Sequence, residues 1–411
     1  MTARERVLSA INHKEPDKIP VDLGGTPSSG ISAIAYNRLV KHTGIENKAN
    51  KVYDVVQQVT QPEEEVLDLF HVDVVDVGRS FHTGAADWHD ATLADGSIAQ
   101  YPSWFHPVMQ ADGSQIAYGN NGEAIAKMPA GATFFDQLVF PYADGYPDDF
   151  KEIRSAMDRV LWQKFVHSPW DDTSADFWEK LRARALDLRS KTDRAITIVC
   201  GCNLFEWGTF LRRIDNFLMD LVLEPEKVEA LLETLLEIHL QTLEKVCDAV
   251  GDVVDVLRFG DDLGTDTGMF MNPDIYRTLF KPRHQKLCDY VHKHSRMKTF
   301  LHSCGSIYPV IPDLIEAGYD IINPVQISAR DMEPEKLKRE FGRDITFWGG
   351  GCDTRAVLNR GTVQEVVDHV KRNIEILAPG GGWVFNTVHN IMPDVPPENI
   401  VAMFETVNGY R

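Results

Sequence analysis

The sequence has no excess of positive charge and no long apolar run. Its 42 Lys and Arg residues are outnumbered by 61 Asp and Glu residues, so the formal net charge is −19. A chain of this charge does not suit nucleic acid or an anionic membrane surface, because both favour basic patches. No uninterrupted apolar stretch approaches the roughly 20 residues that a membrane span needs. We therefore expect neither nucleic-acid nor membrane binding.

Cysteine is also scarce. The chain has 6 Cys in 411 residues, without the regular spacing of a disulfide framework. Such usage is typical of a reducing compartment. The first residues resemble the start of an amphipathic helix and lack the apolar core of a signal peptide. We expect a cytoplasmic protein.

Short apolar runs alternate with long amphipathic runs along most of the chain. This alternation predicts a parallel sheet flanked by helices. The predicted helices include residues 225–250, 273–294, 307–317, 333–341, 362–377 and 397–407. The predicted strands are residues 19–23, 72–77, 195–200, 253–259, 298–304, 320–325, 345–348 and 383–388. Eight strands are the number that a (β/α)₈ TIM barrel requires, and we expect one such α/β domain over residues 1–411. A doubly wound open sheet is the alternative.

Residues 79–141 interrupt this rhythm. They contain Asp95-Gly96, Asp112-Gly113 and Asn121-Gly122 between short alternating runs, and these dipeptides are typical of hairpin turns. The pattern predicts an antiparallel β-meander inserted after the second barrel strand. Its aromatic side chains either cover the barrel mouth as a lid or form a small core of their own.

Polar and metal-binding residues gather where the predicted strands end. In a barrel the active site lies at this end of the strands, so the clustering favours an enzyme. His302 and Cys304 are two residues apart on one strand and therefore share a face. Cys352 follows the seventh strand. An imidazole and two thiolates, with a fourth position open, form a catalytic type of zinc site.

Other interpretations of these residues remain open. Each Cys is also a suitable small core residue, and His302 is suited to a hydrogen-bonded core. Cys200 and Cys202 share a face of the third strand and are rival ligands.

Six further residues at or near strand ends are candidates for catalysis or substrate binding. We predict catalytic roles for the carboxylates Asp261 and Asp262 and for His389, and substrate contacts for Glu206, Trp348 and Asn390. Adjacent carboxylates are also common as helix caps, which is the structural alternative for the first two.

Several segments resemble the uroporphyrinogen decarboxylase superfamily. They are residues 4–7, 17–21, 258–262, 302–305, 314–318 and 396–400, and the resemblance spans nearly the whole chain outside the meander. It implies a (β/α)₈ barrel. The superfamily contains porphyrinogen decarboxylases and zinc methyltransferases that work with corrinoid proteins.

Two motifs place the chain nearer the methyltransferases. The decarboxylases carry an arginine-rich loop after the first strand, whereas residues 22–29 contain no arginine. The His302 and Cys304 pair matches the methyltransferase motif. The third ligand of those enzymes is a Cys near the start of the last strand, where this chain has only Pro379 and three glycines, so Cys352 is the substitute that we consider.

The resemblance thus implies a Zn²⁺-dependent methyltransferase. It would move a methyl group between a small methylated compound (an aryl methyl ether, amine or thiol) and a corrinoid on a separate protein. The chain has no Asp-x-His-x-x-Gly corrinoid motif of its own. A metal-free decarboxylase or lyase and a non-catalytic small-molecule-binding barrel are the alternatives.

Overall fold

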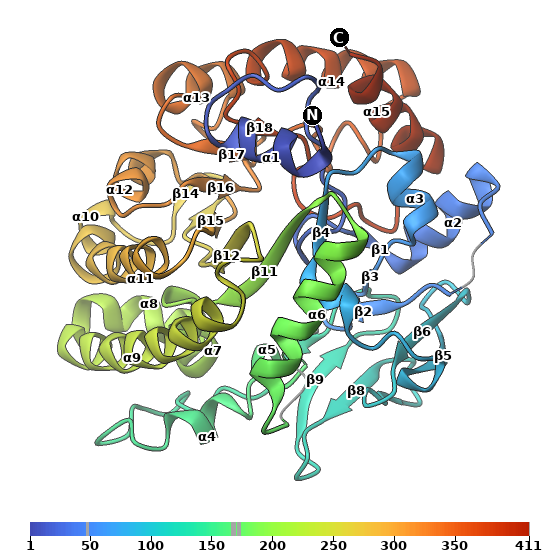
Figure 1. The fold of residues 1–411 in the computed structure, drawn as a ribbon. Coiled ribbons are helices and arrows are strands. Elements are labelled where there is room, and N and C mark those ends of the chain that lie inside the picture. The colour runs from blue at the N-terminus through green and yellow to red at the C-terminus, as the bar shows by residue number, and fades with distance from the viewer. Residues whose placement is uncertain (47–48, 166–169, 171–173, 411) are drawn as a thin grey trace.

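The computed structural model describes residues 1–46, 49–165, 170 and 174–410. Its centre is a seven-stranded parallel sheet in the order β18-β17-β16-β15-β12-β11-β4 (Figure 1). The strands are β4 (Val74–Asp76), β11 (Ala195–Gly201), β12 (Val256–Gly260), β15 (Lys298–His302), β16 (Ile321–Asn323), β17 (Thr346–Trp348) and β18 (Trp383–Val384). The α/β class and the parallel sheet are as predicted.

The predicted first strand, residues 19–23, is reduced to a single bridge between Val21 and Phe385. Phe385 donates its N–H to the Pro20 carbonyl at 2.8 Å, and the N–H of Asp73 reaches the Val21 carbonyl at 2.8 Å. This segment is therefore hydrogen-bonded next to both edge strands of the seven-stranded sheet. Proline lacks an N–H, which helps to keep the pairing here short.

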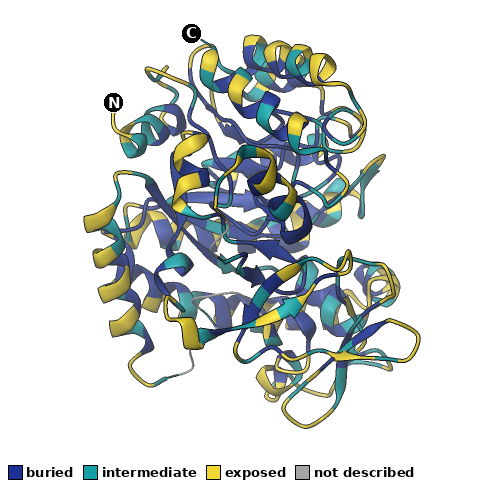
Figure 2. Ribbon diagram, turned by 90° about the vertical axis from the view of Figure 1, so that its right-hand side faces the viewer, coloured by how far each residue is buried: buried dark blue, intermediate teal, exposed yellow. Residues whose placement is uncertain are grey.

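Helices surround the sheet, with their outer faces exposed and the sheet buried (Figures 1 and 2). The longest, α9 (Pro225–Val250), has the predicted bounds. The others that follow or flank the sheet strands are α1 (Ala3–Ile11), α2 (Ala33–Thr43), α3 (Glu64–Leu69), α6 (Phe177–Lys191), α7 (Phe205–Arg212), α8 (Ile214–Leu223), α10 (Pro273–Ile275), α11 (Lys281–His294), α12 (Ile311–Glu316), α13 (Pro334–Phe341), α14 (Val363–Leu377) and α15 (Pro397–Gly409). A π-turn over Tyr276–Phe280 joins α10 to α11. Among the described residues, no helix is both long and apolar enough to cross a membrane.

One small core is formed by helix α1 and one residue from each of the seven strands. Helix α1 contacts β4, β11 and β18 there. The cluster comprises Val7, Ala10, Ile11, Val74, Ala195, Val256, Phe300, Ile321, Trp348 and Val384. Trp348, predicted to contact substrate, is fully buried in this cluster. The strand ends that lie away from α1 are left for a site.

Residues 79–141 form antiparallel strands around the predicted turns. Strands β5 (Trp88–Thr92) and β6 (Ile98–Pro102) form a hairpin, whereas β7 (Val108–Met109), β8 (Gln115–Tyr118), β9 (Ala124–Met128) and β10 (Asp136–Gln137) form a separate sheet. Gly96, Gly113 and Gly122 have φ of 82°, 81° and 77°, the left-handed conformation that such turns require. Tyr101 and Phe105 pack into a core that this region shares with neighbouring segments.

Three short strands, β1 (Ile31–Ser32), β2 (Val52–Asp54) and β3 (Val59–Thr60), pair beside this region. Two short helices, α4 (Ile153–Met157) and α5 (Leu161–Lys164), lead from it towards α6. A β13 (Gly264–Thr265) and β14 (Gly268–Met269) ribbon follows β12.

Candidate active site

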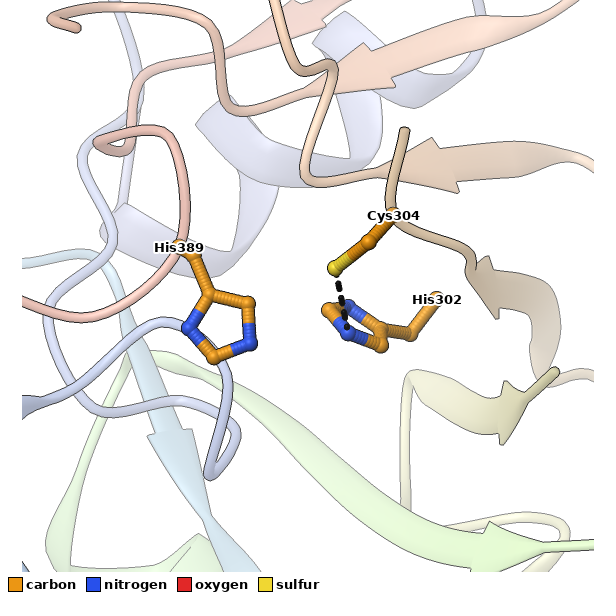
Figure 3. A group of neighbouring side chains, drawn as sticks. All are labelled: His302, Cys304 and His389. Atoms are coloured by element: carbon orange, nitrogen blue, oxygen red, sulfur yellow. Dashed lines mark hydrogen bonds between the residues drawn. The ribbon is translucent and has the colours of Figure 1, made fainter. Parts of the chain in front are cut away.

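His302 ends β15, and Cys304 lies two residues further on (Figure 3). The Cys304 Sγ atom is 3.5 Å from His302 Nε2. Zinc binds thiolate at about 2.3 Å and imidazole at about 2.0 Å, so a tetrahedral site sets its S and N ligand atoms about 3.5 Å apart. The pair therefore fits two positions of a zinc site, as predicted from its spacing.

Asn323 fixes the proton of His302 on the ring nitrogen that faces away from Cys304. Its Nδ2 donates to the Trp348 carbonyl at 2.9 Å, which turns its Oδ1 towards His302 Nδ1 at 2.6 Å. An amide oxygen only accepts, so Nδ1 carries the proton and Nε2 keeps its lone pair. Ligating histidines in proteins are commonly oriented in this way. Burial, with a smaller effect of the Arg258 charge, lowers the pKa of His302 to about 3, so the ring is neutral at physiological pH.

His389 is the third member of the cluster. Its ligand atom lies within 4.8 Å of those of His302 and Cys304, and one of its ring nitrogens faces them (Figure 3). Its Nδ1 accepts the Asn390 N–H at 2.8 Å. A neutral imidazole that accepts at Nδ1 carries its proton on Nε2. In this arrangement His389 offers an Nε2–H donor. It could bind a metal through Nε2 only if Nδ1 gave up the Asn390 hydrogen bond and took the proton.

Cys352, predicted as the third ligand, lies outside this cluster of ligand atoms. Its side chain is fully buried, and its Sγ lies 3.9 Å from the Asp353 carbonyl oxygen. Two of the three preceding glycines, Gly349 and Gly350, have φ of 116° and 69° and turn the backbone after β17. Among the described residues, His389 and not Cys352 lies next to the His302 and Cys304 ligand atoms.

Asp262 and Glu206 lie beside the metal-binding pair and line the cavity in front of it. Asp262 Oδ1 accepts the Cys304 N–H at 2.8 Å and lies 3.7 Å from His302 Nε2. Burial, reinforced by the Asp262 charge, raises the pKa of Glu206 to about 8. Burial raises the pKa of the Cys304 thiol well above its usual range, and the carboxylates of Asp262 and Glu206 add to the effect.

Asp261 points away from the cavity. Its carboxylate accepts the N–H groups of Leu204, Phe205 and Glu206 at 3.2, 3.0 and 2.9 Å, and His284 Nε2 lies 3.1 Å away. Those N–H groups belong to the start of α7. The Asp261 carboxylate therefore caps the N-terminus of α7, which is the alternative role considered for this residue.

Asn390 is likewise engaged with the protein. Its Oδ1 accepts the Gly30 N–H at 2.8 Å and it is 2% exposed. Trp348, buried in the cluster around α1, donates its Nε1–H to Asp22 at 2.8 Å. Neither residue is among those that line the cavity, so the structure does not bring them to the site where substrate contacts were predicted.

The cavity has a volume of about 780 Å³, within the range of small-molecule sites. Glu206, Arg258, Asp262, His302 and His389 lie on its wall. Its aromatic lining residues are Phe134, Trp162, Phe165, Trp170, Phe177, Trp178, Trp207 and Phe210. Of these, only Phe134 comes from residues 79–141. Cys200 and Cys202, the rival ligands, also line the cavity but are not in the metal-binding cluster.

Sequence reasoning missed Arg258 and most of this aromatic lining. Arg258 is a charged residue inside the otherwise apolar strand β12, and that pattern was the available signal. The aromatic residues of α5, α6 and α7 had no comparable signal, because aromatics in helices are commonly core residues.

A larger polar groove, about 980 Å³, lies near the N-terminal ends of the strands. Several of its charged side chains pair with one another. Arg6 contacts Asp73 at 2.5 Å, and Arg194 contacts Glu64 at 2.6 Å. Because these charges are already compensated, the smaller cavity is the better candidate for a functional site.

Comparison with known proteins agrees with this fold. Residues 206–410 match the family described as Uroporphyrinogen decarboxylase (URO-D). The structure is similar to that of a methyltransferase from Methanosarcina mazei, with a TM-score of 0.60 over 100% of this chain and 99% of the other, at 16% sequence identity.

Two curated relatives match parts of the chain. The Methylcobamide:CoM methyltransferase MtaA of Methanosarcina barkeri is 24% identical over 185 residues, which is 44% of this chain and 49% of the relative. The Uroporphyrinogen decarboxylase of Wolinella succinogenes is 27% identical over 95 residues, 23% of this chain and 26% of the relative. The chain thus spans half or less of the length of these relatives. Residues 206–410 form a domain of the uroporphyrinogen decarboxylase family, and the two relatives are a methyltransferase and a decarboxylase.

Proposed function

We propose that the chain is a zinc-dependent methyltransferase that moves a methyl group between a small methylated substrate and a corrinoid carried by a separate protein. One observation carries the proposal. His302 Nε2 and Cys304 Sγ lie 3.5 Å apart beside the cavity, and Asn323 holds the His302 tautomer that leaves a lone pair on Nε2. The MtaA relative, named as a methylcobamide methyltransferase, supports the corrinoid part.

Each side chain would have a distinct role. Bound zinc would supply a Lewis acid that polarises the heteroatom losing or accepting the methyl group. His302 and Cys304 would hold the metal, and Asp262 would orient Cys304 through its backbone N–H. His389 Nε2–H would donate to the heteroatom at the open position. Glu206, largely protonated at neutral pH because its pKa is about 8, would offer a second donor.

The loop at residues 22–29 supports a methyltransferase over a porphyrinogen decarboxylase. Its polar groups bond to one another: Thr26 N–H donates to Ser29 Oγ at 3.0 Å, and Gly25 N–H donates to Asp22 at 2.8 Å. The loop has no arginine. A tetrapyrrole with many carboxylates would need several cations, and among the described residues that line the cavity only Arg154 and Arg258 carry a guanidinium.

Three further features belong to the proposal. The seven strands and the bridge at Val21 would constitute one closed (β/α)₈ barrel within a single domain. Residues 79–141 would cover its mouth. The protein would act in the cytoplasm, which suits six cysteines that are all free thiols.

The test combines metal analysis with methyl transfer. Protein purified without chelator should contain about one zinc per chain, and Cys304→Ser should lose most of it. Cys247→Ser, a change at a buried thiol of α9, is the matched control. Mixed with cob(I)alamin and methoxybenzenes, methylamines or methylthiols, the zinc-loaded protein should produce the absorbance of methyl-Co(III). Full activity in metal-free protein, or release of CO₂ from a carboxylic acid without cobalt, would refute the proposal.

A further inference from the structure

Arg258, a half-buried residue at the cavity, has few hydrogen-bond partners. Its Nη2 donates to Ser28 Oγ at 3.3 Å, and its Nε is buried without a hydrogen-bond partner. Within the described residues, no carboxylate oxygen lies within 4.0 Å of its guanidinium nitrogens. An unsatisfied buried donor is costly, and a guanidinium has five N–H donors to satisfy.

Two other arginines, Arg283 and Arg189, also have a buried Nε without a partner, but each forms an ion pair, unlike Arg258. Arg283 contacts Glu229 at 3.3 Å and Glu233 at 2.8 Å through its Nη2. Arg189 contacts Asp255 at 2.5 Å. Their charge is therefore compensated inside the protein. Arg258 has no such ion pair and lines the cavity, so its free donors face the space that a ligand would fill.

The guanidinium lies close to the proposed reaction centre. A Cβ built on Gly260 would lie 3.3 Å from Arg258 Nη1 and 3.6 Å from Glu206 Oε2, so both groups converge on one point above β12. The Arg258 charge also lowers the pKa of His302 and of His389. A group bound to Arg258 would thus lie beside the metal-binding cluster.

The aromatic part of the cavity is suited to a flat ring. Trp162 stacks on Phe210 with centroids 5.8 Å apart, and Trp207 meets Phe210 edge to face at 5.8 Å. Trp170 and Phe177, which also line the cavity, lie 5.6 Å apart. Aromatic side chains bind rings by offset stacking and edge contacts.

We propose that Arg258 binds an acidic group of the substrate and that the substrate is an aromatic carboxylic acid. A carboxylate matches the planar fork of a guanidinium with two parallel hydrogen bonds. The Asp262 carboxylate near Arg258 disfavours a group of higher negative charge, such as a phosphate. The proposal deepens the proposed function and rests on it for the reaction, but the binding step requires neither metal nor cobalt.

The test compares two probes of the same shape. Chelator-treated protein is titrated with meta-methoxybenzoate and with its neutral amide, following the fluorescence of the cavity tryptophans. We expect wild-type protein to prefer the acid by roughly 10- to 100-fold, because hydrogen bonds to charged groups have about that strength. Arg258→Met should remove the preference while amide binding changes little.

Three further variants test whether Arg258 itself causes the preference for the acid. Arg258→Lys retains the charge without the fork, should show an intermediate preference, and stands in if Arg258→Met does not fold. Arg154→Gln changes an exposed cavity cation that contacts Gln241 and should keep the full preference. Cys304→Ser should keep it too, because the acid then binds without a metal. Equal binding of acid and amide to wild-type protein, or an unchanged preference in both Arg258 variants, would overturn the proposal. Failure of methyl transfer would leave this binding result intact.

Discussion

Replacing Asn323 by leucine tests whether the His302 tautomer prepares the zinc site. The substitution removes the oxygen that accepts the His302 Nδ1–H at 2.6 Å. The ring could then rotate or move its proton to Nε2, where the lone pair is needed. Loss of a hydrogen-bond partner behind a ligating histidine costs about 10- to 100-fold in metal affinity, equivalent to about 1.4 to 2.7 kcal/mol.

The same change affects folding, and the two effects can be separated. Asn323 also donates to the Trp348 carbonyl at 2.9 Å, so leucine leaves a buried acceptor unpaired. That loss should lower the free energy of unfolding by about 1–3 kcal/mol. Zinc affinity is measured by competition with a chromophoric chelator at fixed pH, and stability by urea unfolding of the metal-free protein.

Asn386→Leu is the matched control. Asn386 is 2% exposed, as buried as Asn323, and donates to the Asp22 carbonyl at 2.9 Å without contacting His302. It should lose stability and keep zinc affinity. If Asn323→Leu binds zinc as tightly as wild-type protein, or if both variants lose affinity equally, the argument from the tautomer is wrong.

Four further predictions concern the same centre. Zinc affinity should increase about tenfold per pH unit between pH 5 and 8, because the Cys304 thiol, whose pKa is raised, must release a proton to bind the metal. His302, with a pKa of about 3, is already neutral over this range. A zinc affinity that does not change with pH in a competition titration would contradict this. Cys352→Ser should retain about one zinc per chain by elemental analysis, and loss of the metal would restore Cys352 as a ligand. His389→Gln keeps a hydrogen-bond donor but removes the imidazole, so the protein should retain about one zinc per chain while methyl transfer to cob(I)alamin slows. Loss of zinc from this variant would instead identify His389 as a ligand. Asp261→Asn should lower stability by about 1–3 kcal/mol in urea unfolding because it weakens the cap of α7, and a selective loss of activity in a fully stable variant would instead indicate catalysis.

The metal-binding pair could be predicted because it depends on local geometry. Alternate residues of a strand share a face, and His302 and Cys304 are separated by one residue at a strand end. Cys352 could not be placed by the same rule. It lies beyond Gly349 and Gly350, both with positive φ, and a chain that turns at such residues no longer has the alternation of a strand.

The carboxylates show a similar limit. Adjacent residues such as Asp261 and Asp262 point in different directions, but the sequence does not say which one faces the cavity. The start of α7 decides this, because its free N–H groups lie next to Asp261 and leave Asp262 beside Cys304. The sequence does not distinguish Asp261 from Asp262, and their different orientations depend on a helix that starts more than fifty residues earlier.

The sequence by itself determined the α/β class, the order of strands and helices and the His302–Cys304 pair, because apolar periodicity and strand alternation are properties of neighbouring residues. The tertiary structure alone decided what surrounds that pair. His389, Asn323 and the aromatic side chains of α5, α6 and α7 come from distant parts of the chain. They meet because parallel strands end at one edge of the sheet, and the directions of their side chains are set by packing and hydrogen bonds that no local pattern records.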